Sequence, residues 1–227
     1  MNVNLPLELF YQIISELNLD NILELCQSHR EFNFLCRDEY LWYILFKRDY
    51  PYIYSDYEHP LLNSWKNTML NKSLRYLLEH PLTEYLWEIT QPPSQSLTSE
   101  SNPQVDYIFK GPLTLLIPIS RYSYGYLDEI TINQFFIPKE QILQIIYQYY
   151  QQPLTLEQLD NYLKRDQEEF NKKYPDTKYL PDSFLIQAID AIKRGIIVKH
   201  YELMSNFLYF EGLTPIDDNK FKISLGS

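Results

Sequence analysis

The chain has 227 residues, of which 45% are hydrophobic and 16% aromatic, and this apolar content argues against global disorder. Its formal net charge of −10 repels phosphate backbones and anionic lipid, so nucleic acid and membrane surfaces are not expected partners. A chain of this length forms one large domain or two small ones.

Targeting signals and cysteine usage indicate an intracellular protein. No apolar run approaches the roughly twenty residues that cross a bilayer. The start MNVNLPLEL lacks the basic residues and the small-residue cleavage site of a secretion signal. Cys26 and Cys36 both fall on apolar faces of predicted helices, so we expect them to be reduced and buried, and not to form a disulfide or a metal site. These features predict a location in the cytoplasm or nucleus.

The first fifty residues are predicted to form a set of short amphipathic helices. Pro6 suits the start of a helix, where its missing N–H would be unpaired in any case. Apolar residues then recur at helical spacing from Phe10 to Leu17, and Asp20 and Asp38 are predicted to cap the segments that follow. A unit of this size buries little of its own surface, so its apolar faces require either the rest of the chain or a partner protein.

The order of residues in this segment resembles an F-box. The run LP-x-EL is followed by I-x-x-L, I-x-x-LC, F-x-x-LC and DExLW, within residues 4 to 51. The resemblance implies docking on a Skp-type adaptor, which links an F-box protein to a cullin ubiquitin ligase, while the rest of the chain captures a target. It assigns adaptor contacts to Leu5, Pro6, Leu9, Ile13, Leu17, Ile22, Leu25 and Trp42. Spacing alone does not separate this reading from a helical subdomain packed on its own protein.

Residues 1–51 are therefore expected to be an F-box-like unit, and residues 52–90 a helical connector. Helical spacing returns from Leu61 to Leu78, and Pro81 allows another short helix through Trp87. Residues 91–104 are rich in Pro, Ser and Gln, so we predict an exposed linker there that proteases cut first.

Residues 105–227 are predicted to form a mixed C-terminal domain that binds the target, which makes the chain an α+β protein. Runs rich in β-branched and aromatic residues predict its strands. They lie at residues 105–109, 113–119, 129–136, 196–199, 207–210 and 221–225, and the last two are expected to form a hairpin.

Three helices are expected in the same domain. Pro138 opens the first and Pro153 ends it. Thr155 begins the second, with Gln158 three residues later to complete a capping box. Gly195 is placed to end the third. The stretch QILxxIYxYYQxPLT, with the later FLYFEGL and ISLGS, resembles a C-terminal module of F-box-type proteins encoded by large DNA viruses, and this resemblance implies no activity. For a viral protein the predicted location is the interior of the host cell.

The sequence contains no recognisable catalytic arrangement. The five glycines never cluster, so a phosphate-binding loop is not predicted, and the four histidines are too far apart in sequence to form a ligand pair. Adjacent acids such as Asp128 and Glu129 are expected to be solvated. We therefore expect no enzymatic activity, no cofactor and no metal site.

The leading hypothesis is a non-catalytic, substrate-recruiting adaptor of a Skp-cullin-F-box type ubiquitin ligase. Its partners would be a Skp-type adaptor, a cullin reached through it, and an unknown target protein. The alternative is a structural or interaction protein, of viral origin or not, whose F-box-like helices pack within its own core. A third hypothesis is an unrecognised enzyme on the C-terminal domain, which a concave pocket with convergent polar groups would favour.

Overall fold

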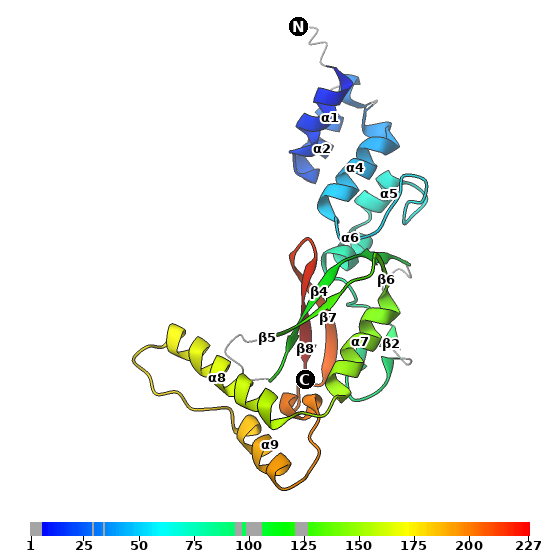
Figure 1. Cartoon of the computed structure of the whole chain (residues 1–227). Helices are drawn as coiled ribbons and strands as arrows, with labels where there is room; N and C mark the ends of the chain where they lie inside the picture. The colour runs from blue at the N-terminus through cyan, green and yellow to red at the C-terminus, as the bar shows by residue number, and fades with distance from the viewer. Residues whose placement is uncertain (1–5, 29, 34, 94–96, 99–105, 121–126) are drawn as a thin grey trace.

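The computed structural model describes residues 6–28, 30–33, 35–93, 97–98, 106–120 and 127–227. The molecule is elongated, with short helices at one end and a β-sheet in the middle (Figure 1). Helices α8 (Leu156–Lys173) and α9 (Ser183–Lys193) lie at the opposite end (Figure 1). Along the chain, an N-terminal group of helices is followed by a mixed region of strands and helices, which confirms the predicted α+β class.

The N-terminal unit contains the predicted short helices. They are α1 (Leu7–Ser15), α2 (Leu19–Ser28), α3 (Arg30–Asn33), the 3₁₀ helix η1 (Leu35–Arg37) and α4 (Glu39–Asp49). Asp38 caps α4 as predicted, since its side chain accepts a hydrogen bond from the Tyr40 N–H. The cap predicted at Asp20 is wrong: Asn18 accepts from the Asn21 N–H instead, and Asp20 lies in the first turn, where its charge favours the helix dipole.

The two cysteines form a disulfide, so the expectation that they are reduced is wrong. Cys26 in α2 and Cys36 in η1 have Cα atoms 5.9 Å apart, within the range that a disulfide spans. The turn at η1 folds the chain back against α2, which brings the two residues together. The bond therefore fastens α2 to the residues that lead into α4.

The connector contains two helices, α5 (Trp65–Leu70) and α6 (Lys72–Glu79), capped by the side chains of Ser64 and Asn71. The helix predicted through Trp87 is wrong, because Tyr85–Glu88 form strand β1. β1 pairs with the last part of the chain, and the Trp87 ring packs on Phe210 with centroids 4.5 Å apart. This pairing overrides the local helical preference, as tertiary contacts commonly do.

Six strands form the main sheet of the described residues, in the order β2-β1-β7-β8-β4-β5. The remaining bounds are β2 (Leu97–Thr98), β4 (Leu113–Pro118), β5 (Leu127–Ile132), β7 (Tyr209–Asp217) and β8 (Lys220–Gly226). β4 and β8 are parallel and the other neighbours are antiparallel. The predicted C-terminal hairpin is confirmed as β7 and β8.

A second, two-stranded sheet pairs β3 (Ile108–Lys110) with β6 (Phe136–Pro138). The strand predicted over residues 129–136 is therefore divided between β5 and β6. The strand predicted over residues 196–199 is wrong. There the chain makes one isolated bridge, between Lys199 and Pro153, and then turns into the 3₁₀ helix η3 (His200–Met204).

The C-terminal helices begin where their capping residues predict. Pro138 is the N-cap of α7 (Lys139–Gln151), and the capping box of Thr155 and Gln158 opens α8. Gly195 follows the end of α9 with φ +82°, a conformation that favours glycine. Helix α7 runs alongside the sheet (Figure 1).

One buried cluster runs from the N-terminal helices through the connector into the sheet. It includes Ile14, Trp42, Phe46, Trp65, Tyr52, Phe109, Phe210 and Phe221. Tyr50, Tyr52 and Ile53 are buried, so packing continues across the boundary expected at residue 51. A separate cluster, which includes Leu159 and Leu185, joins α8 to α9.

A polar cluster fastens α8 to the sheet. The hydroxyls of Tyr149 and Tyr162 each donate to Asp128 Oδ2 at 2.7 Å, so Asp128 is not simply solvated as expected. His200 packs on Tyr149 with ring centroids 4.5 Å apart and is only 1% exposed. Both of its ring nitrogens are buried without a hydrogen-bond partner among the described residues. Burial lowers the pKa of His200 to about 4.

The continuous core predicts one cooperative unfolding transition. Phe221→Ala removes a ring that contacts Tyr52 and Phe109, and should lower the free energy of unfolding by about 3–5 kcal/mol. Urea denaturation followed by circular dichroism measures this. The exposed Ile216 provides the control, since Ile216→Ala should change it by less than about 0.5 kcal/mol. Separate transitions for the helices and the sheet would contradict a shared core.

The buried imidazole predicts a loss of stability in acid. Because the pKa of His200 is about 4 when folded and about 6.5 when unfolded, stability is complete above pH 6.5 and falls as the pH drops toward 4. Between pH 7.5 and 5 this loss amounts to about 2 kcal/mol. The variant His200→Phe should not show this loss of unfolding free energy when urea denaturation is measured at the two pH values. An equal pH dependence in both proteins would show that His200 is not the group responsible.

Candidate adaptor-docking face

Helix α1 presents large apolar side chains to solvent. Leu9 is 47% exposed and Ile13 is 53% exposed, and Pro6, the N-cap residue, is also exposed. Leu9 and Ile13 are four residues apart and therefore lie on one side of the helix. On the other side, Ile14 is buried at 1% exposure. We call Pro6, Leu9 and Ile13 the α1 face.

Aromatic contacts hold α1 against the rest of the unit. The Phe10 ring stacks on Phe32 with centroids 5.5 Å apart, and Tyr11 meets Tyr40 edge-on at 5.8 Å. The Tyr11 hydroxyl also donates to Asp38, the residue that caps α4. Burial and this hydrogen bond raise the pKa of Tyr11 to about 12, so the hydroxyl stays protonated and donates at neutral pH.

The C-terminal end of α1 is held by one arginine. Arg48 Nη1 donates to the carbonyl oxygens of Ser15 and Leu17, each at 2.6 Å, and the same guanidinium pairs with Asp49. Carbonyls at the end of a helix lack intrahelical partners, and hydrogen bonds from a charged donor satisfy them strongly. Together with the aromatic contacts, these bonds fix the direction in which the α1 face points.

Two of the residues predicted to contact the adaptor lie inside the protein. Ile22 and Trp42 have 0% exposure, and Trp42 Nε1 donates to the Cys36 carbonyl at 3.0 Å. Neither side chain is accessible in this structure, so their role as contact residues stays a prediction that this burial does not favour. Their apolar surface is used to pack α2 and α4, because the unit shares its core with the connector.

The remaining predicted residues differ in position. Leu17 and Leu25 are half-buried and pack against the core cluster, so each has some surface left for a partner. Leu5 lies outside the described residues. Of the predicted set, the structure therefore brings Pro6, Leu9 and Ile13 together as an exposed surface. The sequence pattern alone does not distinguish these residues from Ile14, since all of them are apolar.

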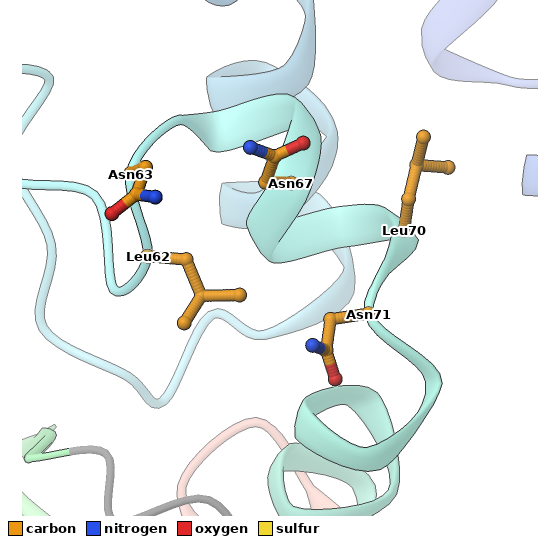
Figure 2. Close-up of a pocket in the computed structure, with 5 residues that line it drawn as sticks. All are labelled: Leu62, Asn63, Asn67, Leu70 and Asn71. Atoms are coloured by element: carbon orange, nitrogen blue, oxygen red, sulfur yellow. The ribbon is translucent and has the colours of Figure 1, made fainter.

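A recess of about 420 Å³ lies on the connector, between the loop before α5 and the start of α6. It is lined by Leu62, Asn63, Asn67, Leu70 and Asn71. In Figure 2, Leu62 points into the space between this loop and α6, whereas Leu70 points the opposite way. The lining residues include no titratable side chain, so the recess offers amide hydrogen bonds and no acid–base group.

The described residues offer little for other chemistry. Among them, no group of three or more His, Cys, Asp or Glu side chains is arranged to hold a metal ion. Within the same part of the chain, no helix combines the length and the apolar character needed to cross a membrane.

Comparison with known proteins gives one match. Residues 3–48 fit the family model described as F-box-like, which covers less than a quarter of the chain. No curated protein and no solved structure matches the chain, so the resemblance of the C-terminal half to a viral module has no support here. The matched residues include α1 and nearly all of α4, and the exposed α1 face thus belongs to an F-box-like segment.

Proposed function

We propose that this protein is the substrate-recruiting subunit of a Skp-cullin-F-box type ubiquitin ligase. The F-box-like match supports binding to a Skp-type adaptor in general, and F-box-like domains act as adaptors without catalysing a reaction. In this proposal the α1 face docks on the Skp-type adaptor, which brings a cullin. The part of the chain that follows the F-box-like unit captures the protein to be ubiquitylated.

The exposed α1 face is the observation that carries the proposal. Apolar side chains of the F-box-like segment such as Ile14, Ile22 and Trp42 are buried in the protein's own core, yet Leu9 and Ile13 are left about half exposed on a helix held firmly in place. Covering the exposed half of each side chain yields about 1 kcal/mol. A helix that presents such residues fits the mode in which an apolar helix face enters a groove of a partner.

The shape of the molecule supports the division into two binding regions. Helix α1 and the α8–α9 pair lie at opposite ends, with the sheet between them (Figure 1). In the segments before and after α9, Leu180 and Ile197 are 72% and 75% exposed. An adaptor on α1 therefore leaves the rest of the molecule, from the sheets to α8 and α9, free for a target.

The continuous core favours the second candidate function, a structural or interaction protein that needs no adaptor. Trp42 and Phe46 pack in the same cluster as the sheet residues Phe210 and Phe221, so the F-box-like helices are also part of the protein's own interior. The two candidates differ in one respect: only the ligase subunit requires the α1 face to bind another protein.

Two charges on the α1 face should abolish adaptor binding. Leu9→Glu combined with Ile13→Glu places carboxylates in an apolar interface and should weaken binding to a eukaryotic Skp-type adaptor by about a hundredfold or more. Glutamate is a good helix former, so α1 should remain folded. Co-expression followed by size-exclusion chromatography, with calorimetry on the purified proteins, measures the loss.

The matched control carries the same two charges elsewhere. Tyr76 and Ile216 are 54% and 55% exposed, and Tyr76→Glu with Ile216→Glu should leave adaptor binding unchanged. If the α1 double variant bound the adaptor as tightly as the control, the docking assignment would be wrong. If the unmodified protein ignored the adaptor and remained monodisperse, the structural candidate would replace the ligase subunit.

A further inference from the structure

The segment after α4 lies along β3 of the small two-stranded sheet, with an isolated antiparallel bridge between Ile53 and Phe109. The Tyr54 N–H donates to the Ile108 carbonyl at 2.7 Å, and the Lys110 N–H donates to the Tyr52 carbonyl at 2.8 Å. Since side chains alternate along a strand, Ile108 and Lys110 point outward while Phe109 between them is fully buried. The outer side of this sheet therefore joins residues from the connector with residues of the C-terminal domain.

Aromatic rings cover the outer side of this sheet. Phe135 and Phe136 are 55% and 50% exposed, and Ile108 is 38% exposed. The Tyr54 ring meets Phe136 edge-on with centroids 4.5 Å apart, and Phe135 contacts Phe136 at 4.8 Å. Rings that support one another in this way form an apolar surface with little freedom to rearrange. We call Tyr54, Ile108, Phe135 and Phe136 the aromatic face.

A small pocket of about 170 Å³ opens beside this face. It is lined by Tyr54, Ser55, Asp56, His59, Leu61, Asp106, Tyr107 and Ile108. Small-molecule sites usually measure about 300–1,000 Å³, and this pocket is below that range. It equals the volume of roughly five or six water molecules at about 30 Å³ each, which is the scale of one side chain. Tyr54 and Ile108 belong both to the pocket and to the aromatic face.

The pocket is acidic. Asp56 Oδ1 accepts hydrogen bonds from His59 Nδ1 at 2.8 Å and from the N–H groups of Glu58 and His59. The side-chain hydrogen bond from His59 lowers the pKa of Asp56, which keeps the carboxylate charged at neutral pH. Asp106, which lies just before β3, adds a second carboxylate to the pocket.

An unpartnered hydroxyl also lines the pocket. Ser55 is 7% exposed, and its Oγ has no hydrogen-bond partner among the described residues. A buried polar group without a partner costs free energy, which a ligand that hydrogen-bonds to it recovers. The two carboxylates offer acceptors, which suit a cation that carries several donors, and the Ser55 hydroxyl lies buried in the wall of the pocket.

We propose that this pocket binds an arginine side chain of the protein that the chain captures, while an apolar side chain next to that arginine packs on the aromatic face. A guanidinium carries five donors in a planar fork and stacks on aromatic rings such as Tyr54, which a compact ammonium does less well. Lys110 lies on the outer side of the sheet with Ile108 and pairs with Phe136 on the neighbouring strand. Its charge repels a second basic side chain of the partner, so an apolar side chain is favoured beside Phe136. The identification of this partner as a ubiquitylation target rests on the proposed function.

Blocked dipeptides test the proposal with the full-length protein. The probe is acetyl-arginyl-leucine amide, titrated into isotope-labelled protein and followed by amide NMR shifts. The matched peptides carry citrulline in place of arginine, which removes the charge and keeps the shape, or glycine in place of leucine. We expect saturable binding of the arginyl-leucine peptide with shifts centred on residues 54–59 and 106–108, and about tenfold weaker binding of the citrulline peptide.

Two variants assign the contacts separately. Asp106 is exposed, and Asp106→Asn should weaken binding of both arginine peptides about tenfold. Phe136→Ala should weaken the arginyl-leucine peptide severalfold and leave the arginyl-glycine peptide unchanged. Equal binding of the arginine and citrulline peptides, shifts elsewhere on the protein, or no effect of either variant would overturn the proposal.

Adaptor binding is measured on the same variants, so the two proposals fail in different ways. The variants Asp106→Asn and Phe136→Ala should bind the Skp-type adaptor as the unmodified protein does, since the aromatic face does not include α1. Loss of peptide recognition with adaptor binding intact supports the pocket. Adaptor binding without any recognition of the arginyl-leucine peptide overturns the pocket alone. If the protein recognises the peptide but does not bind the adaptor, the pocket proposal is supported and the proposed role as a ligase subunit is rejected.

Discussion

The structure depends on aromatic packing that joins the N-terminal helices to the sheet. Phe46 and Trp65 lie 4.9 Å apart between α4 and α5, and Tyr52 meets Phe221 of β8 edge-on at 4.9 Å. The Tyr52 hydroxyl donates to the Leu78 carbonyl at 2.6 Å, which ties α6 to the same point. These contacts fix the angle between α1 and the sheet, as the proposed role of holding one partner relative to another would need.

This packing also bears on the proposed use of the F-box-like segment. Ile22 and Trp42 fill the protein's own core, whereas Leu9 and Ile13 of α1 are exposed. The Cys26–Cys36 disulfide and the Arg48 hydrogen bonds secure the ends of the helices around it. Under the proposed function, one segment is both part of the interior and a binding surface, and an F-box-like match is then compatible with a continuous core.

The elements predicted correctly from the sequence are those whose structure is determined by neighbouring residues. The Thr155 and Gln158 capping box, the Pro138 start of α7 and the C-terminal hairpin all depend on local chemistry, and all were predicted. The elements predicted wrongly are those that depend on residues far apart in the sequence. Strand β1 forms because Trp87 packs on Phe210, and the disulfide forms because η1 folds back on α2. On the docking face, the helical period placed α1 correctly but did not reveal which apolar residues are exposed, since burial depends on the connector and the sheet.

The most direct test of the central claim is hydrogen–deuterium exchange of the full chain, with and without a bound Skp-type adaptor. The adaptor should slow exchange in α1 (Leu7–Ser15), and α7 and β4 should exchange at unchanged rates, because docking covers the α1 face and leaves the fixed core as it is. Unchanged exchange in α1, with protection appearing over the sheet or over α8 and α9, would contradict the assignment of the docking surface.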